Sequence, residues 1–201
     1  MLKKVLSSKI IQISTVILLS FFIQIYAASQ GLMEQYFILE TPLEKYPWTI
    51  ITAVFAHSGI THLTSNMTGL LLFGIPVAWK ASTFKFHLFF ISTGALAGIS
   101  QVLTSYYLYQ IGFGAEPIGV VGASGAVFAL MGYLITSNKV SEKTSQYIPL
   151  PNKLRYLLYF GVATWITLAT ASPQAALIGH FTGLMLGLVA GKKNLLRKKL
   201  N

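Results

Sequence analysis

The sequence predicts an all-α membrane protein built as a bundle of six transmembrane helices. Hydrophobic residues make up 54% of the 201 residues and charged residues only 10%, and the mean hydropathy is +0.63. This composition is typical of proteins that cross a membrane several times. Six uncharged runs are each close to the roughly 20 residues that a helix needs to cross the hydrocarbon core. The basic residues gather at the ends of these runs, as they do beside membrane-spanning helices.

The boundaries of the predicted helices follow the gaps between charged residues. No formal charge lies between Arg155 and Lys192, and a single helix of that length, about 54 Å, is too long to cross a bilayer once. We therefore place a turn at Ser172-Pro173 and divide this run in two. The predicted spans are 10–28, 60–79, 86–104, 119–136, 154–171 and 174–191.

The first span, 10–28, has two interpretations. Lys3, Lys4 and Lys9 ahead of an apolar run, with the small residues 27–29 behind it, also fit a secretory signal peptide and its cleavage site. The run is longer than the signal core of about 7–15 residues that such peptides use. We therefore favour a first helix that is retained.

The segment 29–59 joins the first two spans and is rich in aromatic residues. Tyr36, Phe37, Tyr46 and Trp48 are interleaved there with glutamates and prolines. Aromatic side chains favour the boundary between membrane and water, so we expect an interfacial outer loop along the outer leaflet. The alternative, an unstructured outer loop, would leave these aromatics in water without a partner.

The charge distribution predicts the orientation of the chain. Fourteen of the 15 Lys and Arg residues fall on the side that holds both termini, and only Lys45 falls opposite. Such an excess marks the cytoplasmic side, so we expect cytoplasmic N- and C-termini. Large loops and organellar targeting features are missing, which suggests a multi-pass protein of a prokaryotic cytoplasmic (inner) membrane. The basic residues form no groove-sized patch, so the lipid bilayer and not nucleic acid is the predicted partner.

Four polar side chains on three predicted helices lie at a similar depth. Counted along the helices, Ser124, His180, His62 and Asn66 lie about 5–10 Å below the outer surface. Polar and ionisable groups are costly in lipid and often functional. His62 and Asn66 are four residues apart and share a helix face. A nucleophile, Ser124, and a base, His180, can therefore meet within the membrane.

Glycines predict that the fourth and sixth helices approach closely. Glycines form a stripe without side chains along the last span, and further glycines reduce the side-chain bulk of the fourth span. The stripe consists of Gly179, Gly183, Gly187 and Gly191, and the fourth span contains Gly119, Gly122, Gly125 and Gly132. Small residues let helix backbones touch, and this contact would carry His180 toward Ser124. Packing alone is the alternative interpretation.

Three motifs together resemble the rhomboid intramembrane serine proteases. They are Gly122-Ala123-Ser124-Gly125 followed by Phe128, then His62-x-x-x-Asn66, and His180-x-x-Gly183-x-x-x-Gly187. The motifs occur in the order of that family, and the resemblance covers about residues 45–191. The family's outer loop often carries a Trp-Arg pair, whereas Trp48 is followed here by Thr49.

The resemblance implies a fold and a role for each matching residue. The implied fold is a six-helix bundle of rhomboid type with its core at about 45–191. Because the sequence shows no sizeable soluble domain, we expect one membrane domain over 1–201 with a basic tail at 192–201. By similarity, Ser124 is the nucleophile and His180 the general base, and His62 and Asn66 help to hold the oxyanion. The aromatic residue at the position of Phe128 packs against the catalytic histidine.

Physical chemistry agrees with these roles. A serine hydroxyl needs a base to accept its proton. The sequence has no aspartate, and its five glutamates lie outside the spans, so a Ser-His dyad is expected and not a triad. The Ser124 backbone N–H would complete the oxyanion site. A zinc site of His57, His62 and His180 would lack carboxylates and cysteines, so neither a metal nor another cofactor is expected.

The predicted function is therefore that of a serine endopeptidase, a peptide hydrolase that cleaves transmembrane segments of membrane proteins near the outer face. The substrate must unwind locally, because a helix shields its own peptide bonds. One alternative is a non-catalytic relative that binds transmembrane helices as a chaperone or adaptor. Another is a small-solute transporter, which the absence of an inverted repeat disfavours. The oligomeric state and the particular substrate stay open.

Overall fold

The computed structural model describes residues 8–137 and 176–197, together with the single positions 151, 154, 157 and 161. The described residues are helical apart from loops and two isolated β-bridges. The elements are α2 (Ser8–Ser29), α3 (Met33–Tyr36), α4 (Thr49–Thr52), η1 (Ala53–Phe55), α5 (Ile60–Gly69), η2 (Leu70–Gly74), α6 (Ile75–Ala78), α7 (Thr83–Gln110), α8 (Ser124–Thr136) and α11 (Leu177–Lys192).

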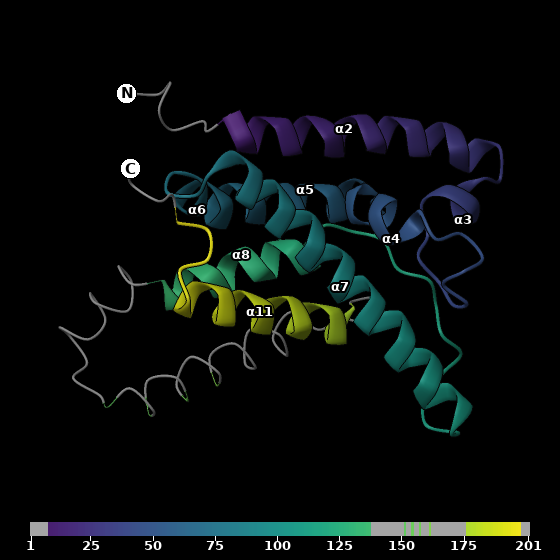
Figure 1. Cartoon of the computed structure of the whole chain (residues 1–201). Helices are drawn as coiled ribbons and strands as arrows, with labels where there is room; N and C mark the ends of the chain where they lie inside the picture. The colour runs from purple at the N-terminus through teal and green to yellow at the C-terminus, as the bar shows by residue number, and fades with distance from the viewer. Residues whose placement is uncertain are drawn as a thin grey trace.

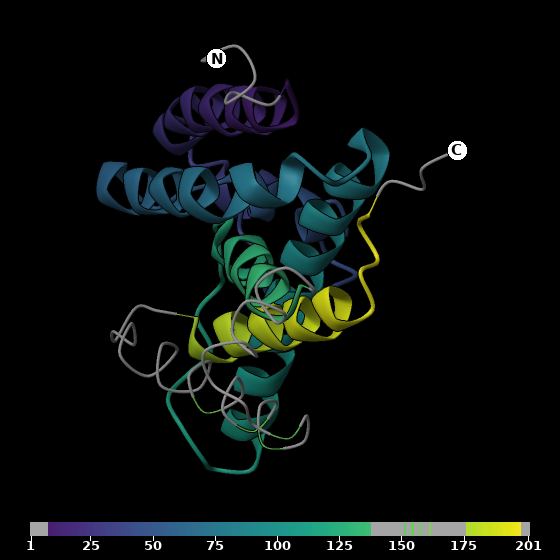
Figure 2. The same ribbon diagram turned by 90° about the vertical axis from the view of Figure 1, so that its left-hand side faces the viewer.

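These helices are arranged in layers. The α5–α6 rod lies between α2 and the pair formed by α8 and α11, and the long α7 runs obliquely across them (Figure 1). The view turned by 90° shows the same order of layers (Figure 2). The principal core lies between them, and its fully buried side chains include Phe86, Phe90, Leu70 and Leu130.

Helix α2 matches the predicted first span and has two distinct faces. Ile10, Ile13 and Ile17 recur at helical spacing and are buried against the protein. The outward face exposes large apolar side chains, among them Phe22 at 68% and Ile23 at 59%. An apolar face with no protein against it suits contact with lipid.

The predicted span 60–79 is a rod of three consecutive helical segments. The α-helix α5 passes into the π-helical segment η2, which is followed by α6. Pro76 has no N–H, so the carbonyl four residues earlier lacks its usual α-helical partner. The wider π turns lie directly before this proline, which is where such an adjustment is needed.

Helix α7 is longer at both ends than the predicted span 86–104. The Ser82 hydroxyl accepts a hydrogen bond from the Lys85 N–H at 3.3 Å and caps the helix N-terminus. At the other end the helix continues to Gln110 and stops before Gly112, which has φ +76°. The charge gaps locate hydrocarbon boundaries, whereas capping residues and glycines decide where the helix itself ends.

The prediction for the fourth span, 119–136, is wrong at its N-terminal end. Helix α8 begins only at Ser124, and Val120 instead forms an antiparallel bridge with Leu39 of the outer loop. The Leu39 N–H donates to the Val120 carbonyl at 3.0 Å, and the Val120 N–H donates back at 2.8 Å. Gly119 and Gly122 therefore lie outside the fourth helix, and the depth of Ser124 cannot be counted along a helix from Gly119.

The last helix begins later than predicted, and the total number of spans is not tested by the structure. Helix α11 replaces the predicted span 174–191, so His180 lies in its first turn and not about two turns inside. In the described part of the chain, α2 and α7 are the two helices long and apolar enough to cross a membrane, while α8 and α11 are shorter. The turn at Ser172-Pro173 and most of span 154–171 lie outside the described residues, so the six-helix count stays a prediction.

The outer loop, 29–59, is folded and contains α3, α4 and η1, of which α4 and η1 pack against α7. The Trp48 indole N–H donates to the Gln35 carbonyl at 2.7 Å. The Lys45 ammonium bonds the Glu34 carboxylate and lies 3.2 Å from Glu40 Oε1. These bonds, with Glu34 first, raise the pKa of Lys45 to about 12. Contact of this loop with the outer leaflet stays a prediction.

Candidate active site

Ser124 lies at the junction between an extended segment and a helix. It is the first residue of α8, and the outer loop holds the backbone before it, because the Gly122 N–H donates to the Ala53 carbonyl at 2.8 Å. Gly122 has φ +128°, a conformation that residues with a Cβ rarely adopt. This glycine therefore lets the chain turn into α8 with Ser124 at the helix start.

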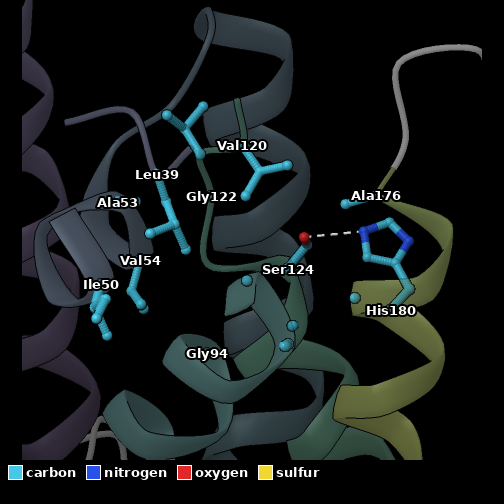
Figure 3. A pocket seen from close by; sticks show the side chains of 15 residues that line it. Leu39, Ile50, Ala53, Val54, Gly94, Val120, Gly122, Ser124, Ala176 and His180 are labelled. Carbon is cyan, nitrogen blue, oxygen red and sulfur yellow. Dashed lines mark hydrogen bonds between the residues drawn. The ribbon is translucent and has the colours of Figure 1, made fainter. Parts of the chain in front are cut away.

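The His180 imidazole faces the Ser124 hydroxyl. Its Nε2 lies 2.9 Å from Ser124 Oγ (Figure 3), within the reach that nucleophile activation requires. The Phe128 ring stacks on the imidazole with centroids 4.4 Å apart and planes 10° apart. Phe128 lies one turn after Ser124 on α8, so the helix that carries the hydroxyl also fixes the plane of the base. The arrangement suits proton transfer from Ser124 Oγ to His180 Nε2.

Glycines on α11 bring the two helices together. A Cβ added at Gly183 would lie 2.1 Å from the Gly125 carbonyl oxygen, and one at Gly187 would lie 2.1 Å from the Ala129 carbonyl oxygen. No side chain fits at either position. The backbones of α8 and α11 therefore touch along two successive turns next to His180, as the glycine stripe predicts.

His62 and Asn66 approach the same place from α5. A Cβ added at Gly122 would lie 2.7 Å from His62 Nε2 and 3.6 Å from Asn66 Nδ2, so the missing side chain makes room for both groups. The Ser58 N–H lies 3.5 Å and its hydroxyl 3.1 Å from His62 Nδ1. An N–H can only donate, which leaves Nε2 of a neutral ring as the N–H that points toward Gly122.

Asn66 carries a hydrogen-bond donor without a partner. Its side chain is buried, and Nδ2 has no hydrogen-bond partner among the described residues. Buried donors are nearly always satisfied, so a free one beside the nucleophile suits an oxygen that arrives with the substrate. Ser124 also lies at the N-terminus of α8, where helix N–H groups and the helix dipole favour negative charge.

A small cavity of about 30 Å³ adjoins Ser124 and His180 (Figure 3). The outer loop closes it on one side and α7 and α11 on the others. Its walls are made mostly of glycine, alanine and branched apolar residues, namely Leu39, Ile50, Ala53, Val54, Gly94, Ala97, Gly98, Val120, Val121, Gly122, Gly125, Ala176 and Gly179. The cavity has room for a group of one or a few heavy atoms.

In the described part of the chain, no three His, Cys, Asp or Glu side chains gather to hold a metal ion. The His57 and His62 rings meet edge to face with centroids 5.0 Å apart. The chemistry that these groups can perform is acid, base and nucleophilic.

Sequence reasoning missed the pairing of Gln24 with His57. His57 lies shortly before α5, and the structure buries it completely. The Gln24 side chain bonds both backbone groups of His57, because its oxygen accepts from the His57 N–H at 2.8 Å and its amide donates to the His57 carbonyl. An amide side chain in an apolar run needs such partners. The position of Gln24 in the first apolar run was therefore the sequence feature that could have indicated a buried hydrogen bond.

Comparison with known proteins gives a consistent result. The model of the Rhomboid domain matches residues 44–196. RHOMBOID-like protein 6, mitochondrial, of Arabidopsis thaliana is 31% identical over 145 residues, which cover 72% of this chain and 42% of the plant protein. RHOMBOID-like protein 9, chloroplastic, of the same plant is 34% identical over 118 residues, which cover 57% of this chain and 25% of that protein.

A bacterial relative is covered more fully. The Bacillus subtilis (strain 168) protein YdcA, whose name assigns it provisionally to the rhomboid proteases, is 26% identical over 153 residues. The match covers 73% of this chain and 68% of the bacterial protein. By contrast, the chain spans less than half the length of the two plant relatives.

Proposed function

This chain belongs to the rhomboid family of membrane proteins, and from that premise we propose that it is a membrane-embedded serine endopeptidase. The observation that carries the proposal is the 2.9 Å approach of His180 Nε2 to Ser124 Oγ. A packing serine and a structural histidine would not need this alignment, nor the ring of Phe128 stacked on the base.

The reaction follows from the two side chains. His180 Nε2 accepts the Ser124 proton as Oγ attacks the carbonyl carbon of the scissile peptide bond. His180 then gives that proton to the leaving amide nitrogen as the C–N bond breaks, and an acyl-enzyme remains on Ser124. A water molecule gives a proton to His180, attacks the ester and releases the acid, and His180 returns the proton to Ser124 Oγ.

Charge that develops on the carbonyl oxygen is met by donors already in place. The Ser124 backbone N–H lies at the start of α8, Asn66 Nδ2 is buried and has no partner among the described residues, and His62 offers its Nε2–H. Such preorganised donors act strongly where water is excluded, and the loss of one typically lowers kcat about 10²- to 10³-fold.

The substrate class follows from the cavity and the surroundings of the site. A cavity of about 30 Å³ admits a small side chain beside the scissile bond and rejects Leu or Phe. Transmembrane segments with small residues, which also unwind readily, are therefore the preferred substrates. Reporters that carry Ala, Val or Phe at the scissile position should be cleaved in that order of decreasing kcat/KM.

The remaining parts of the proposal concern the chain in its membrane. The basic ends of the chain lie in the cytoplasm, on the ground of the Lys and Arg distribution, and the active site opens to the outer side. The chain acts as a single domain in a prokaryotic cytoplasmic membrane. Its partners are membrane-protein substrates and the surrounding lipid.

The test compares the wild-type protein with Ser124→Ala in liposomes that contain a single-span reporter. Gel analysis and mass spectrometry should find cleavage within or beside the reporter's span, and the variant should lose it. A serine-directed fluorophosphonate should label Ser124 in the wild type and not in His180→Ala, because the base would be missing. If all three proteins show the same cleavage and the same labelling across several reporters, the protease proposal is wrong and the helix-binding chaperone or adaptor is favoured.

A further inference from the structure

Helix α11, which carries His180, begins without a capping residue of its own. Ala176 occupies the N-cap position and has no side-chain oxygen. The His180 N–H bonds the Ala176 carbonyl at 2.8 Å, but the N–H groups of the three residues before it have no partner within the helix. In most helices a Ser, Thr, Asp or Asn at the N-cap accepts from the second or third of these groups.

A side chain from another helix takes over this task. Gln101 of α7 places its Oε1 3.0 Å from the Ile178 nitrogen and 3.1 Å from the Gly179 nitrogen, and it accepts from both. These are the two N–H groups that a local cap would bond. The Gln101 amide is itself oriented, because Nε2 donates to Ser105 Oγ at 2.9 Å. Helix α11 is thus capped by α7 immediately before His180.

Two further contacts hold the same turn of α11 against α7. Ser100 Oγ and Thr182 Oγ1 lie 2.9 Å apart. A Cβ added at Gly179 would lie 3.1 Å from the Ala97 carbonyl oxygen, so the two backbones are close at this level. The first turn of α11 is therefore fixed against α7 in both rotation and translation.

We propose that Gln101 is a positioning residue for the general base, an inference that rests on the proposed protease function. Gln101 does not touch the reacting atoms. It holds the two peptide groups that precede His180, and through them the imidazole at hydrogen-bonding distance from Ser124. A misplacement of about 1 Å in such an alignment can lower the rate about a hundredfold.

The experiment uses Gln101→Met, which keeps the length of the side chain and removes the acceptor. Three quantities are measured in liposomes, namely the rate of fluorophosphonate labelling of Ser124 per folded molecule and the kcat and KM for the single-span reporter. Labelling and kcat should each fall about tenfold or more while KM changes less than about twofold, because the reactivity of the dyad is lost and not substrate binding.

Two companion variants separate positioning from stability. Thr136→Val removes the bond from Thr136 Oγ1 to the Leu188 carbonyl, 2.8 Å long, which joins α8 to the far end of α11. It should lower the thermal unfolding temperature and leave the labelling rate unchanged. Ala176→Ser in the Gln101→Met background supplies a local N-cap oxygen to the same two N–H groups and should restore most of the lost rate.

The outcomes are distinct. A Gln101→Met protein that labels at the wild-type rate, or a double variant that stays as slow as Gln101→Met, would overturn the positioning role and leave the protease intact. A wild-type protein that neither labels nor cleaves would overturn the protease proposal and this role with it. Amide hydrogen exchange of the wild type gives a check that needs no variant, because fast exchange at Ile178 and Gly179 would show that the cap is not formed.

Discussion

The two walls of the active site are held together by opposite means. On the α11 side, glycines such as Gly183 and Gly187 let the backbones of α8 and α11 touch, with no side chain between them at these two positions. On the α5 side, the segment before His62 is tied to α2 through the amide of Gln24. The α11 wall thus meets α8 through backbone contact, with side-chain hydrogen bonds to α7 beside it, whereas the α5 wall is tied to α2 through a side chain.

The two kinds of contact suit the functional groups that each wall holds. The base and the nucleophile face each other across the glycine contact and need a fixed separation. Closely packed backbones provide it, because neither helix can shift without a steric clash. The oxyanion donors meet an atom that arrives only with the substrate, and a hydrogen-bonded wall suffices for them. Changes to the glycine wall should therefore destroy the enzyme, whereas changes to the other wall should weaken it in graded steps.

The largest effect is expected for Gly183→Leu. Its Cβ would lie 2.1 Å from the Gly125 carbonyl oxygen, so α8 and α11 must separate and the dyad with them. Little folded protein should be recovered, and cleavage and fluorophosphonate labelling should be lost. Gly59→Ala is the matched control, because no atom lies within 4 Å of a Cβ there and its φ of 168° is open to any residue. An active Gly183→Leu protein would contradict the backbone contact.

The next effect concerns Asn66→Ala on the hydrogen-bonded wall. The lost Nδ2 donor has no partner among the described residues, so the folded protein should lose little stability. The kcat for the reporter should fall about 10²- to 10³-fold. Thr64→Ala on the same helix removes only local bonds to the Ile60 and Thr61 carbonyls and should leave kcat unchanged. Equal kcat values for the two variants would remove Asn66 from the oxyanion site.

A smaller effect is expected for Gln24→Leu. Both backbone groups of His57 would lose their buried partner, which should lower the free energy of unfolding by about 1–3 kcal/mol. The labelling rate of Ser124 per folded molecule should persist, because the glycine wall is untouched. Gln12→Leu on the exposed face of α2 is the control, and denaturation in detergent measures both variants. A labelling rate that fell as far as in Gln101→Met would show that the two walls are not independent.

The smallest effect is expected for Lys45→Met in the outer loop, remote from both walls. Its partners are the exposed carboxylate of Glu34 and the partly exposed one of Glu40, and ion pairs at the surface contribute little. The raised pKa of Lys45, about 12, means that the contribution of its charge is complete below the usual pKa of 10.5 and is lost only as the pH rises through about 12. Wild type and variant should show parallel unfolding temperatures between about pH 6 and pH 9.

The parts of the structure that were predictable depend on local pattern. The apolar run at 10–28 corresponds to α2, because an apolar segment of that length has few alternatives to a helix in a membrane. The glycine stripe predicted the contact of α11 with α8, because residues without a side chain at regular helical spacing leave room for a neighbouring backbone. Membership of the rhomboid family was likewise predictable, because its motifs are short and contiguous.

The parts that were not predictable depend on distant partners. Residues 119–122 are as free of charge as a membrane-spanning helix, but Val120 pairs with Leu39 and the Gly122 N–H bonds the Ala53 carbonyl, so they do not join α8. The tasks of Gln24 and Gln101 depend on backbone groups 33 and 77 residues away. No periodicity or spacing encodes such contacts, because they form only when the helices pack together.

The pairing of Leu39 with Val120 restricts where residues can be inserted or deleted. It links the outer loop to the strand-like segment that leads into Ser124. Because side chains alternate along an extended backbone, a shift of one residue on either side would turn Leu39 out of the cavity and displace the serine. We therefore expect insertions to be tolerated at the exposed positions 44 and 45, beyond this pairing, and to be harmful at residues 38–40 and 119–123, which must keep their register.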